Sequence, residues 1–446
     1  MTTTATSRVP GLERLDAALA AARPQRTGRV GAVVGLSVEV EGLDGAIGDA
    51  LSIETPSGPL AAEVVAASGR GLVCLPYGEL AGVARGAAVR RPIGGGPGQV
   101  DLTVPIGPSL LGRVLDGLGR PIDGGPPLGA APRARVDHSA PHPLRRSPVD
   151  RPLSLGVRVL DTLVPCGRGQ RLGIFAGSGV GKSTLLSMIA RGTTADVSVL
   201  ALVGERGREV GEFLTHDLGA DGLARSVVVV ATGDEPALLR RRAALTATRI
   251  AEGFRDEGRD VVLMMDSVTR FCMAQREIGL SAGEPPATRG YPPSVFSLLP
   301  RLLERAGTSE HGSITGLYTV LVDGDDMNEP ISDAARSILD GHIVLSRRLA
   351  TAGHYPCVDV LDSVSRVAPR VTDDQQRELA TRLRSLLAAK RDAQDLIEVG
   401  AYVPGTNPLV DRANELAVGI DAFLRQESSA VADAGDSWRR LRELVG

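Results

Sequence analysis

The chain has 446 residues, of which 43% are hydrophobic, and its 50 Lys plus Arg against 53 Asp plus Glu leave a net charge of −3. This length predicts two to four domains, and the near balance of charge argues against a protein that binds nucleic acid through bulk electrostatics. Four scattered cysteines without a CxxC pair indicate neither a disulfide framework nor a zinc site, and no apolar run approaches the roughly 18 residues of a membrane span.

The N-terminal segment, residues 1–26, contains apolar residues at helical spacing. Leu12, Leu15, Leu19 and Ala22 follow this spacing, and Pro24 ends it. The pattern predicts a short amphipathic helix. Its role is open between packing on its own domain and tethering a partner protein.

Residues 27–96 change to a period of two, which predicts a small all-β domain, most simply a barrel. Leu36, Val38 and Val40 alternate with polar residues, and glycine-containing turns recur at short intervals. Residues 97–370 then alternate apolar strand candidates with helical segments, which predicts a mostly parallel sheet covered on both faces. The strand candidates are 172–175, 197–203, 227–230, 261–265, 314–322 and 343–345.

Residues 371–446 predict a helical C-terminal domain. Asp373 and Asp374 precede a long helical pattern and are expected to cap it. The expected fold is therefore α/β, with a small N-terminal β-barrel and a helical C-terminal domain around a P-loop core.

The phosphate-binding motif lies at 169–184, where an apolar strand is followed by a small-residue turn, Lys182 and a helical pattern. Such a turn directs backbone N–H groups into one concavity at a helix N-terminus. The strict pattern places glycine where this chain has Ala176, which is a tolerable change because Ala176 is small and glycine follows. Lys182 and Lys390 are the only lysines in the chain, so lysine is retained where a compact charge suits phosphate. The residues predicted to hold the nucleotide are Gly177, Ser178, Gly179, Val180, Gly181, Lys182, Ser183 and Thr184.

Two further strand candidates end in groups suited to phosphoryl transfer. The run 261–265 closes on Asp266, a Walker B arrangement in which Asp266 and the Ser183 hydroxyl would bind Mg²⁺. The run 197–203 leads to Glu205, placed to orient or deprotonate water, and to Arg206, placed for the γ-phosphate. Spacing alone is equally compatible with an exposed charged loop at 204–209.

Seven motifs in one order resemble the rotary ATPase β-subunit superfamily, and within it the ATPases of type III protein export, over about residues 25–425. The motifs are GRVLDGLGRPIDG (112–124), FAGSGVGKS (175–183), GERGREV (204–210), GDDMNEP (324–330), GHIVLSR (341–347), HYPCVDVLDSVSR (354–366) and VGAYVPG (399–405). The resemblance implies a RecA-like core and Mg²⁺-dependent ATP hydrolysis. It implies that Glu205 is the catalytic glutamate, that Tyr355 stacks on adenine, and that Arg366 is an arginine finger for the neighbouring subunit of a homohexamer.

The resemblance also implies partners and a location. These are a coiled-coil stalk met by the acidic loop at Asp325 and Asp326, a stator-like regulator at the N-terminus, and an export gate with chaperones and substrates. The expected location is cytoplasmic, at the cytoplasmic face of the inner membrane. Arg270 is expected to join the polar network near Asp266.

The flagellar type is favoured over the injectisome type by the motif at 324–330. Three rival hypotheses stay open: a catalytic subunit of a rotary ATP synthase, a hexameric RNA helicase, and a nucleotide-binding scaffold with little turnover. No nucleic-acid partner is expected.

Overall fold

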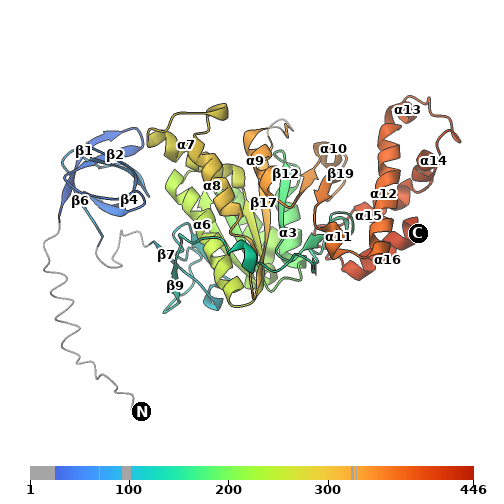
Figure 1. Ribbon diagram of the computed structural model, residues 1–446, viewed down its shortest axis with the longest axis horizontal. Helices are drawn as coiled ribbons and strands as arrows, with labels where there is room; N and C mark the ends of the chain where they lie inside the picture. The colour runs from blue at the N-terminus through green and yellow to red at the C-terminus, as the bar shows by residue number, and fades with distance from the viewer. Residues whose placement is uncertain (1–25, 70, 93–101, 323–325, 328) are drawn as a thin grey trace, which may run out of the picture. The chain divides into compact units, whose positions relative to one another are not determined.

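The computed structural model describes residues 26–69, 71–92, 102–322, 326–327 and 329–446 (Figure 1). The chain divides into two compact units, residues 1–100 and 101–446. The predicted amphipathic helix at Leu12–Ala22 lies outside the described residues. Within the described ranges, no helix has both the length and the apolar character needed to cross a membrane.

The first unit contains a closed barrel of six strands in the order β1-β2-β5-β4-β3-β6, which confirms the predicted barrel. Val38, Val40, Leu51 and Ile53 point into its core, as the period of two predicts. Leu36 does not, because it follows Gly35 (φ +58°) in the turn between β1 and β2 and is 53% exposed. The strands are β1 Gly28–Val34, β2 Ser37–Glu41, β3 Ala50–Thr55, β4 Gly58–Ser68, β5 Gly71–Pro76 and β6 Ala88–Arg90.

The second unit is built on a nine-stranded sheet in the order β19-β18-β12-β17-β15-β13-β14-β8, with β16 paired to β17. All neighbours are parallel except β18 with β19 and β16 with β17. All six predicted strands form, and β8, β16 and β19 add to them. The strands are β8 Val114–Asp116, β12 Arg171–Ala176, β13 Val197–Glu205, β14 Ser226–Thr232, β15 Asp260–Asp266, β16 Gly307–Thr308, β17 Ser313–Leu321, β18 Gly341–Leu345 and β19 Val358–Ser365.

Helices cover both faces of this sheet, which explains why its strands are apolar throughout. Successive residues of a strand enter different cores: Leu200 and Leu202 pack with α3, whereas Val199 and Ala201 pack with α6 and α7. Figure 1 shows α6, α7 and α8 on one side of the sheet and α3 on the other. The helices are α2 Arg158–Leu163, α3 Lys182–Gly192, α4 Gly207–Glu212, α5 Gly219–Ala224, α6 Ala237–Asp256, α7 Val268–Ser281, α8 Pro293–Leu303, α9 Pro330–Ile338 and α10 Arg347–Thr351. A π-helical turn, η3 Phe213–Leu218, separates α4 from α5.

The C-terminal region is helical, as predicted. Asp373 caps α12 through a capping box, in which its side chain accepts from Gln376 N at 2.8 Å and the Gln376 side chain accepts from Asp373 N at 3.1 Å. Leu383 of α12 and Leu441 of α16 join the core that also contains α3. The helices are α11 Ala368–Val371, α12 Asp374–Asp392, α13 Gln394–Glu398, α14 Pro408–Glu415, α15 Ala417–Leu424 and α16 Ala434–Val445. The proposed domain boundaries at 96/97 and 370/371 stay predictions.

Candidate active site

The phosphate loop connects β12 to α3. Gly179 (φ +75°) and Gly181 (φ +85°) adopt left-handed backbone conformations that favour glycine. Ala176 needs no such conformation, because it is the buried last residue of β12 and its carbonyl accepts from Val322 N at 3.1 Å. No side chain among the described residues caps the N-terminus of α3, which leaves its first N–H groups available to a ligand. The departure from the strict motif therefore imposes no backbone strain at Ala176.

Three charged side chains meet at the mouth of this loop. Lys182 Nζ lies 3.4 Å from Glu205 Oε1 and forms an ion pair with Asp266 Oδ1. Lys182 begins α3, Glu205 ends β13 and Asp266 ends β15, so the parallel sheet collects all three at the carboxyl ends of its strands. Their side chains are only 12%, 15% and 4% exposed, respectively.

Burial and mutual charge set the protonation of this cluster. Burial alone would lower the pKa of Lys182, but the charges of Asp266 and Glu205 outweigh it and raise the pKa. Burial, followed by repulsion from Asp266, raises the pKa of Glu205 in spite of Lys182 and Arg270 nearby. Lys182 is therefore held as the cation, while Glu205 is held as a stronger base than an exposed glutamate.

Tyr355 lies beside the phosphate loop. A Cβ built on Gly181 would be 3.3 Å from Tyr355 Cε1, so the ring is in close contact with the loop backbone. The residue as a whole is 44% exposed. Its carbonyl accepts from Gln426 N at 2.9 Å, which ties it to the segment after α15. A partly exposed aromatic residue next to a phosphate loop suits a stacked base.

Three other predicted residues lie apart from the cluster. Arg206 is 82% exposed in its side chain and pairs with Glu209 at 3.1 Å. Arg366 is exposed after β19, where its Nη2 donates to the Arg336 carbonyl at 3.5 Å. Asp326 pairs with Arg289 at 3.2 Å, whereas Asp325 is outside the described residues. Within one chain, then, the sheet gathers Lys182, Glu205 and Asp266 but not Arg206 or Arg366.

Comparison with known proteins places this geometry in a family. Residues 156–365 match the ATP synthase alpha/beta family nucleotide-binding domain, and residues 372–443 match the T3SS EscN ATPase C-terminal domain. The chain belongs to the type III export ATPases.

Relatives and solved structures agree over nearly the whole chain. The flagellum-specific ATP synthase of Bacillus subtilis is 50% identical over 95% of this chain and 96% of its own length. The type 3 secretion system ATPase of Xanthomonas euvesicatoria is 49% identical over 94% of each chain. The structure of the assembled ATPase EscN from the enteropathogenic E. coli type III secretion system superposes with a TM-score of 0.88 at 43% identity. That superposition covers 94% of this chain and 100% of EscN.

The donor set of this export ATPase fits Mg²⁺. Ser183 is exposed on the first turn of α3, and its hydroxyl makes no hydrogen bond to another described residue. Asp266 uses Oδ1 for its contacts with Lys182 and Thr319, while its Oδ2 accepts from no described residue. No cluster of three or more His, Cys, Asp or Glu that would hold a metal occurs in the described ranges. One hydroxyl and one carboxylate beside a phosphate site are typical of Mg²⁺, which keeps most of its ligands from phosphate and water.

Two further residues of the site were not singled out from the sequence. Thr319 on β17 is fully buried, and its hydroxyl donates to Asp266 Oδ1 at 2.8 Å. A polar residue inside the apolar run 314–322 was the available signal. Gly204 (φ +74°) is the other, because a Cβ there would be 2.9 Å from Arg270 Cβ. The absence of a side chain at Gly204 lets Arg270 lie close to Glu205, and the positive charge of Arg270 lowers the pKa of Glu205 in part.

Proposed function

We propose that this chain hydrolyses ATP at the site formed by Lys182, Glu205 and Asp266, as an export ATPase of the flagellar type. The observation that carries the proposal is the convergence of one ammonium and two carboxylates at the mouth of a phosphate loop. The injectisome type is the alternative, since the Xanthomonas relative is nearly as similar as the Bacillus relative. The flagellar type is favoured by the sequence 324–330 and by the names of the relatives from Bacillus subtilis and Salmonella typhimurium.

Each side chain has a role in this reaction. The loop N–H groups and Lys182 bind the terminal phosphates, while Tyr355 stacks on the adenine. Glu205 orients the attacking water and accepts its proton, a task for which its raised pKa suits it. Ser183 and Asp266 hold Mg²⁺, which when bound neutralises charge on the phosphates.

Two arginines complete the charge balance. Arg206 reaches the γ-phosphate after leaving Glu209, and the cost is small because an exposed pair of this kind contributes about 0–1 kcal/mol. Arg366 acts on the site of the neighbouring subunit, where a finger supplied in trans accelerates hydrolysis by about 10³–10⁵-fold. Its exposure and its separation from the cluster of its own chain support that role.

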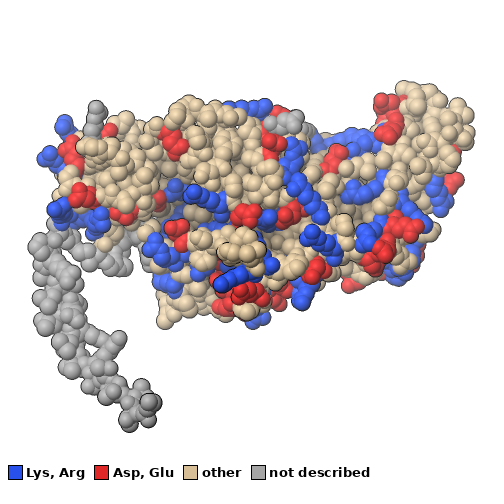
Figure 2. Space-filling model, viewed as in Figure 1, with Lys and Arg blue, Asp and Glu red and all other residues tan. Residues whose placement is uncertain are grey.

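The working assembly is a homohexameric ring. The relative EscN has been solved in complex with its central stalk EscO, and a coiled-coil stalk at the loop around Asp326 is the corresponding partner here. We also infer a stator-like regulator at residues 1–26, and an export gate, chaperones and substrates at the cytoplasmic face of the inner membrane. Basic and acidic side chains are interspersed on the face drawn in Figure 2, which gives no support to a nucleic-acid partner.

The test is ATP hydrolysis measured against protein concentration, with and without RNA, for the unmodified chain and Arg366→Ala. We expect activity per subunit that rises cooperatively with concentration, ignores RNA, and falls at least about 10³-fold in the variant. Activity proportional to concentration with Arg366→Ala near normal would contradict the shared site. Stimulation by RNA would favour a hexameric helicase instead.

A further inference from the structure

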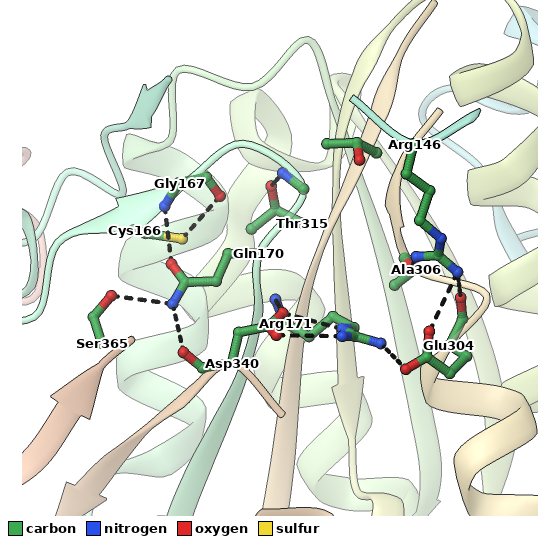
Figure 3. Close-up of polar contacts among 12 residues, drawn as sticks. Arg146, Cys166, Gly167, Gln170, Arg171, Glu304, Ala306, Thr315, Asp340 and Ser365 are labelled. Atoms are coloured by element: carbon green, nitrogen blue, oxygen red, sulfur yellow. Dashed lines mark hydrogen bonds and ion pairs between the residues drawn. The ribbon is translucent and has the colours of Figure 1, made fainter. Parts of the chain in front are cut away.

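A polar cluster around the buried Gln170 joins the residue before β12 to Asp340, just before β18, and to Ser365, just before Arg366 (Figure 3). Gln170 Nε2 donates to the Asp340 carbonyl and to Ser365 Oγ, both at 3.1 Å. Ser365 Oγ in turn donates to the Pro165 carbonyl at 2.7 Å. The cluster lies at the opposite end of β12 from the phosphate loop, because β12 begins at Arg171 and ends at Ala176.

Gln170 is fully buried, and every polar atom of its amide is engaged. Its Oε1 accepts from Gly167 N at 2.9 Å, while its two Nε2 hydrogens serve Asp340 and Ser365. In Figure 3 the amide points from the β12 side toward these two residues. A buried amide with all its hydrogen bonds made holds its partners in one arrangement, since any shift would leave a buried polar group unpaired.

Asp340 is itself held on several sides. The Arg171 guanidinium donates to both carboxylate oxygens, at 3.1 and 3.2 Å, and Arg171 N donates to Oδ2 at 3.1 Å. The backbone returns the contact, with Asp340 N donating to the Arg171 carbonyl at 2.8 Å. Arg171 also pairs with Glu304. Asp340 is thus a rigid attachment point.

Arg366 is attached to this cluster by its backbone only. Its N–H donates to the Asp340 carbonyl at 2.9 Å, so that carbonyl is shared between Gln170 and Arg366. The preceding residue, Ser365, is fixed by Gln170 and Pro165. The guanidinium, by contrast, is exposed and makes only the 3.5 Å contact with Arg336 among the described residues. A fixed backbone with a side chain free to extend is what a residue needs to reach a second subunit reproducibly.

We propose that Gln170 is a positioning residue for Arg366, acting on the neighbouring subunit's ATP site rather than on its own. The inference rests on the trans role of Arg366 proposed above. Loss of the Gln170 amide leaves the Asp340 carbonyl and Ser365 Oγ without this donor, and the backbone that carries Arg366 loses its fixed place. The consequence falls on the transition state of the neighbour, because the finger contributes to kcat and not to ATP binding.

The test uses Gln170→Leu and the milder Ser365→Ala in the full chain, with ring assembly checked by size-exclusion chromatography. We expect kcat to fall by about 10²-fold in Gln170→Leu and by about fivefold in Ser365→Ala, with KM for ATP unchanged. Gln275→Leu is the matched control. Gln275 is also buried, but its amide joins α7 to α8 through Ser294 Oγ at 3.1 Å and does not contact the finger segment. Its kcat is expected to stay at the unmodified level.

Mixed rings separate a trans effect from a local one. Subunits carrying Gln170→Leu keep Glu205, and subunits carrying Glu205→Gln keep a well-placed finger. In a 1:1 mixture about one quarter of all sites combine an intact Glu205 with an intact neighbouring finger, so activity should return to about a quarter of the unmodified level. Neither variant alone should show this activity. A 1:1 mixture of Arg366→Ala with Glu205→Gln should recover activity to the same extent.

If activity returns when Arg366→Ala is mixed with Glu205→Gln but not when Gln170→Leu is mixed with Glu205→Gln, the proposal is overturned while the proposed function stays intact. If one inactive subunit inactivates a whole ring, both mixtures stay inactive. The double variant Gln170→Leu with Arg366→Ala then provides the test. If Gln170 acts through Arg366, adding Gln170→Leu to Arg366→Ala should not lower the residual kcat further. An additive loss would instead place Gln170 in its own site or in the fold, against the proposal.

Discussion

Replacing Glu205 by Gln removes the carboxylate that contacts Lys182 and that we propose accepts the proton of the attacking water, while keeping the size of the side chain. Lys182 loses a partner at 3.4 Å but keeps its ion pair with Asp266. The amide still orients a water molecule through hydrogen bonds, but it accepts no proton. The substitution therefore isolates the proton transfer from the packing of the site.

The expected loss is about 10²–10⁴-fold in kcat, or about 3–5 kcal/mol of barrier. The thermal stability of the variant should not fall along with its activity. Burial and Asp266 raise the pKa of Glu205 in the folded chain, so its ionised form favours the unfolded state once the pH exceeds the unfolded pKa. At neutral pH the variant loses this unfavourable contribution, and its Tm should be no lower than that of the unmodified chain.

The assay is phosphate release at saturating Mg-ATP and at protein concentrations that maintain the ring, together with a thermal melt. Glu212→Gln provides the control, since Glu212 lies in the same segment, is 56% exposed in its side chain and pairs only distantly with Arg208. Glu205→Gln retaining more than about a tenth of kcat would refute Glu205 as the base. A lowered Tm would show that the loss came from folding.

Three further predictions concern the adenine contact of Tyr355, the hydrogen bond of Thr319 to Asp266, and the buried Glu252. Tyr355→Ala should raise KM for ATP by about tenfold with a smaller change in kcat, whereas Tyr355→Phe should match the unmodified chain in steady-state kinetics. Thr319→Val removes the 2.8 Å hydrogen bond to Asp266, and titration of activity with Mg²⁺ should show that about tenfold more metal is needed for half-maximal rate. Glu252 is fully buried against Arg305, and Glu252→Gln should cost about 3–5 kcal/mol in urea unfolding with KM unchanged. Burial alone would raise the pKa of Glu252, but Arg305 and His138 lower it to about 2, so the stability this pair supplies should be lost as pH falls from about 4.5 toward 2.

Much of the fold was predictable because its signals are local. The apolar runs of β13, β15 and β17 are long enough to be recognised without knowledge of their neighbours, and the capping box at Asp373 is written within four residues. The edge strands β8 and β19 were not predicted as strands. One has three residues, and the other alternates buried with exposed positions because it borders the sheet and pairs antiparallel with β18.

The convergence of the three charged residues was predictable for a similar reason. Lys182, Glu205 and Asp266 each stand in a motif at a strand end, and the parallel topology brings them together. Thr319 and Gln170 depend instead on which strands become neighbours. Thr319 meets Asp266 because β17 lies beside β15 with Met265 opposite Tyr318, and Gln170 meets Ser365 across 195 positions of chain. The hydrophobic pattern within either segment does not indicate which part of the chain becomes its neighbour.

The closure of the N-terminal barrel has a consequence for how this unit is recognised. β1 pairs with both β2 and β6, and β6 with both β1 and β3, so each described strand of the barrel has a neighbour on both sides and none is left as a full edge to which another chain could add. A partner that binds this unit therefore recognises its side chains. Side-chain contacts can change by single substitutions, whereas the addition of a strand requires a whole strand to pair in register. Partner choice at the barrel is therefore open to gradual adjustment, and barrels crowded together in an assembly do not template one another into a continuous sheet.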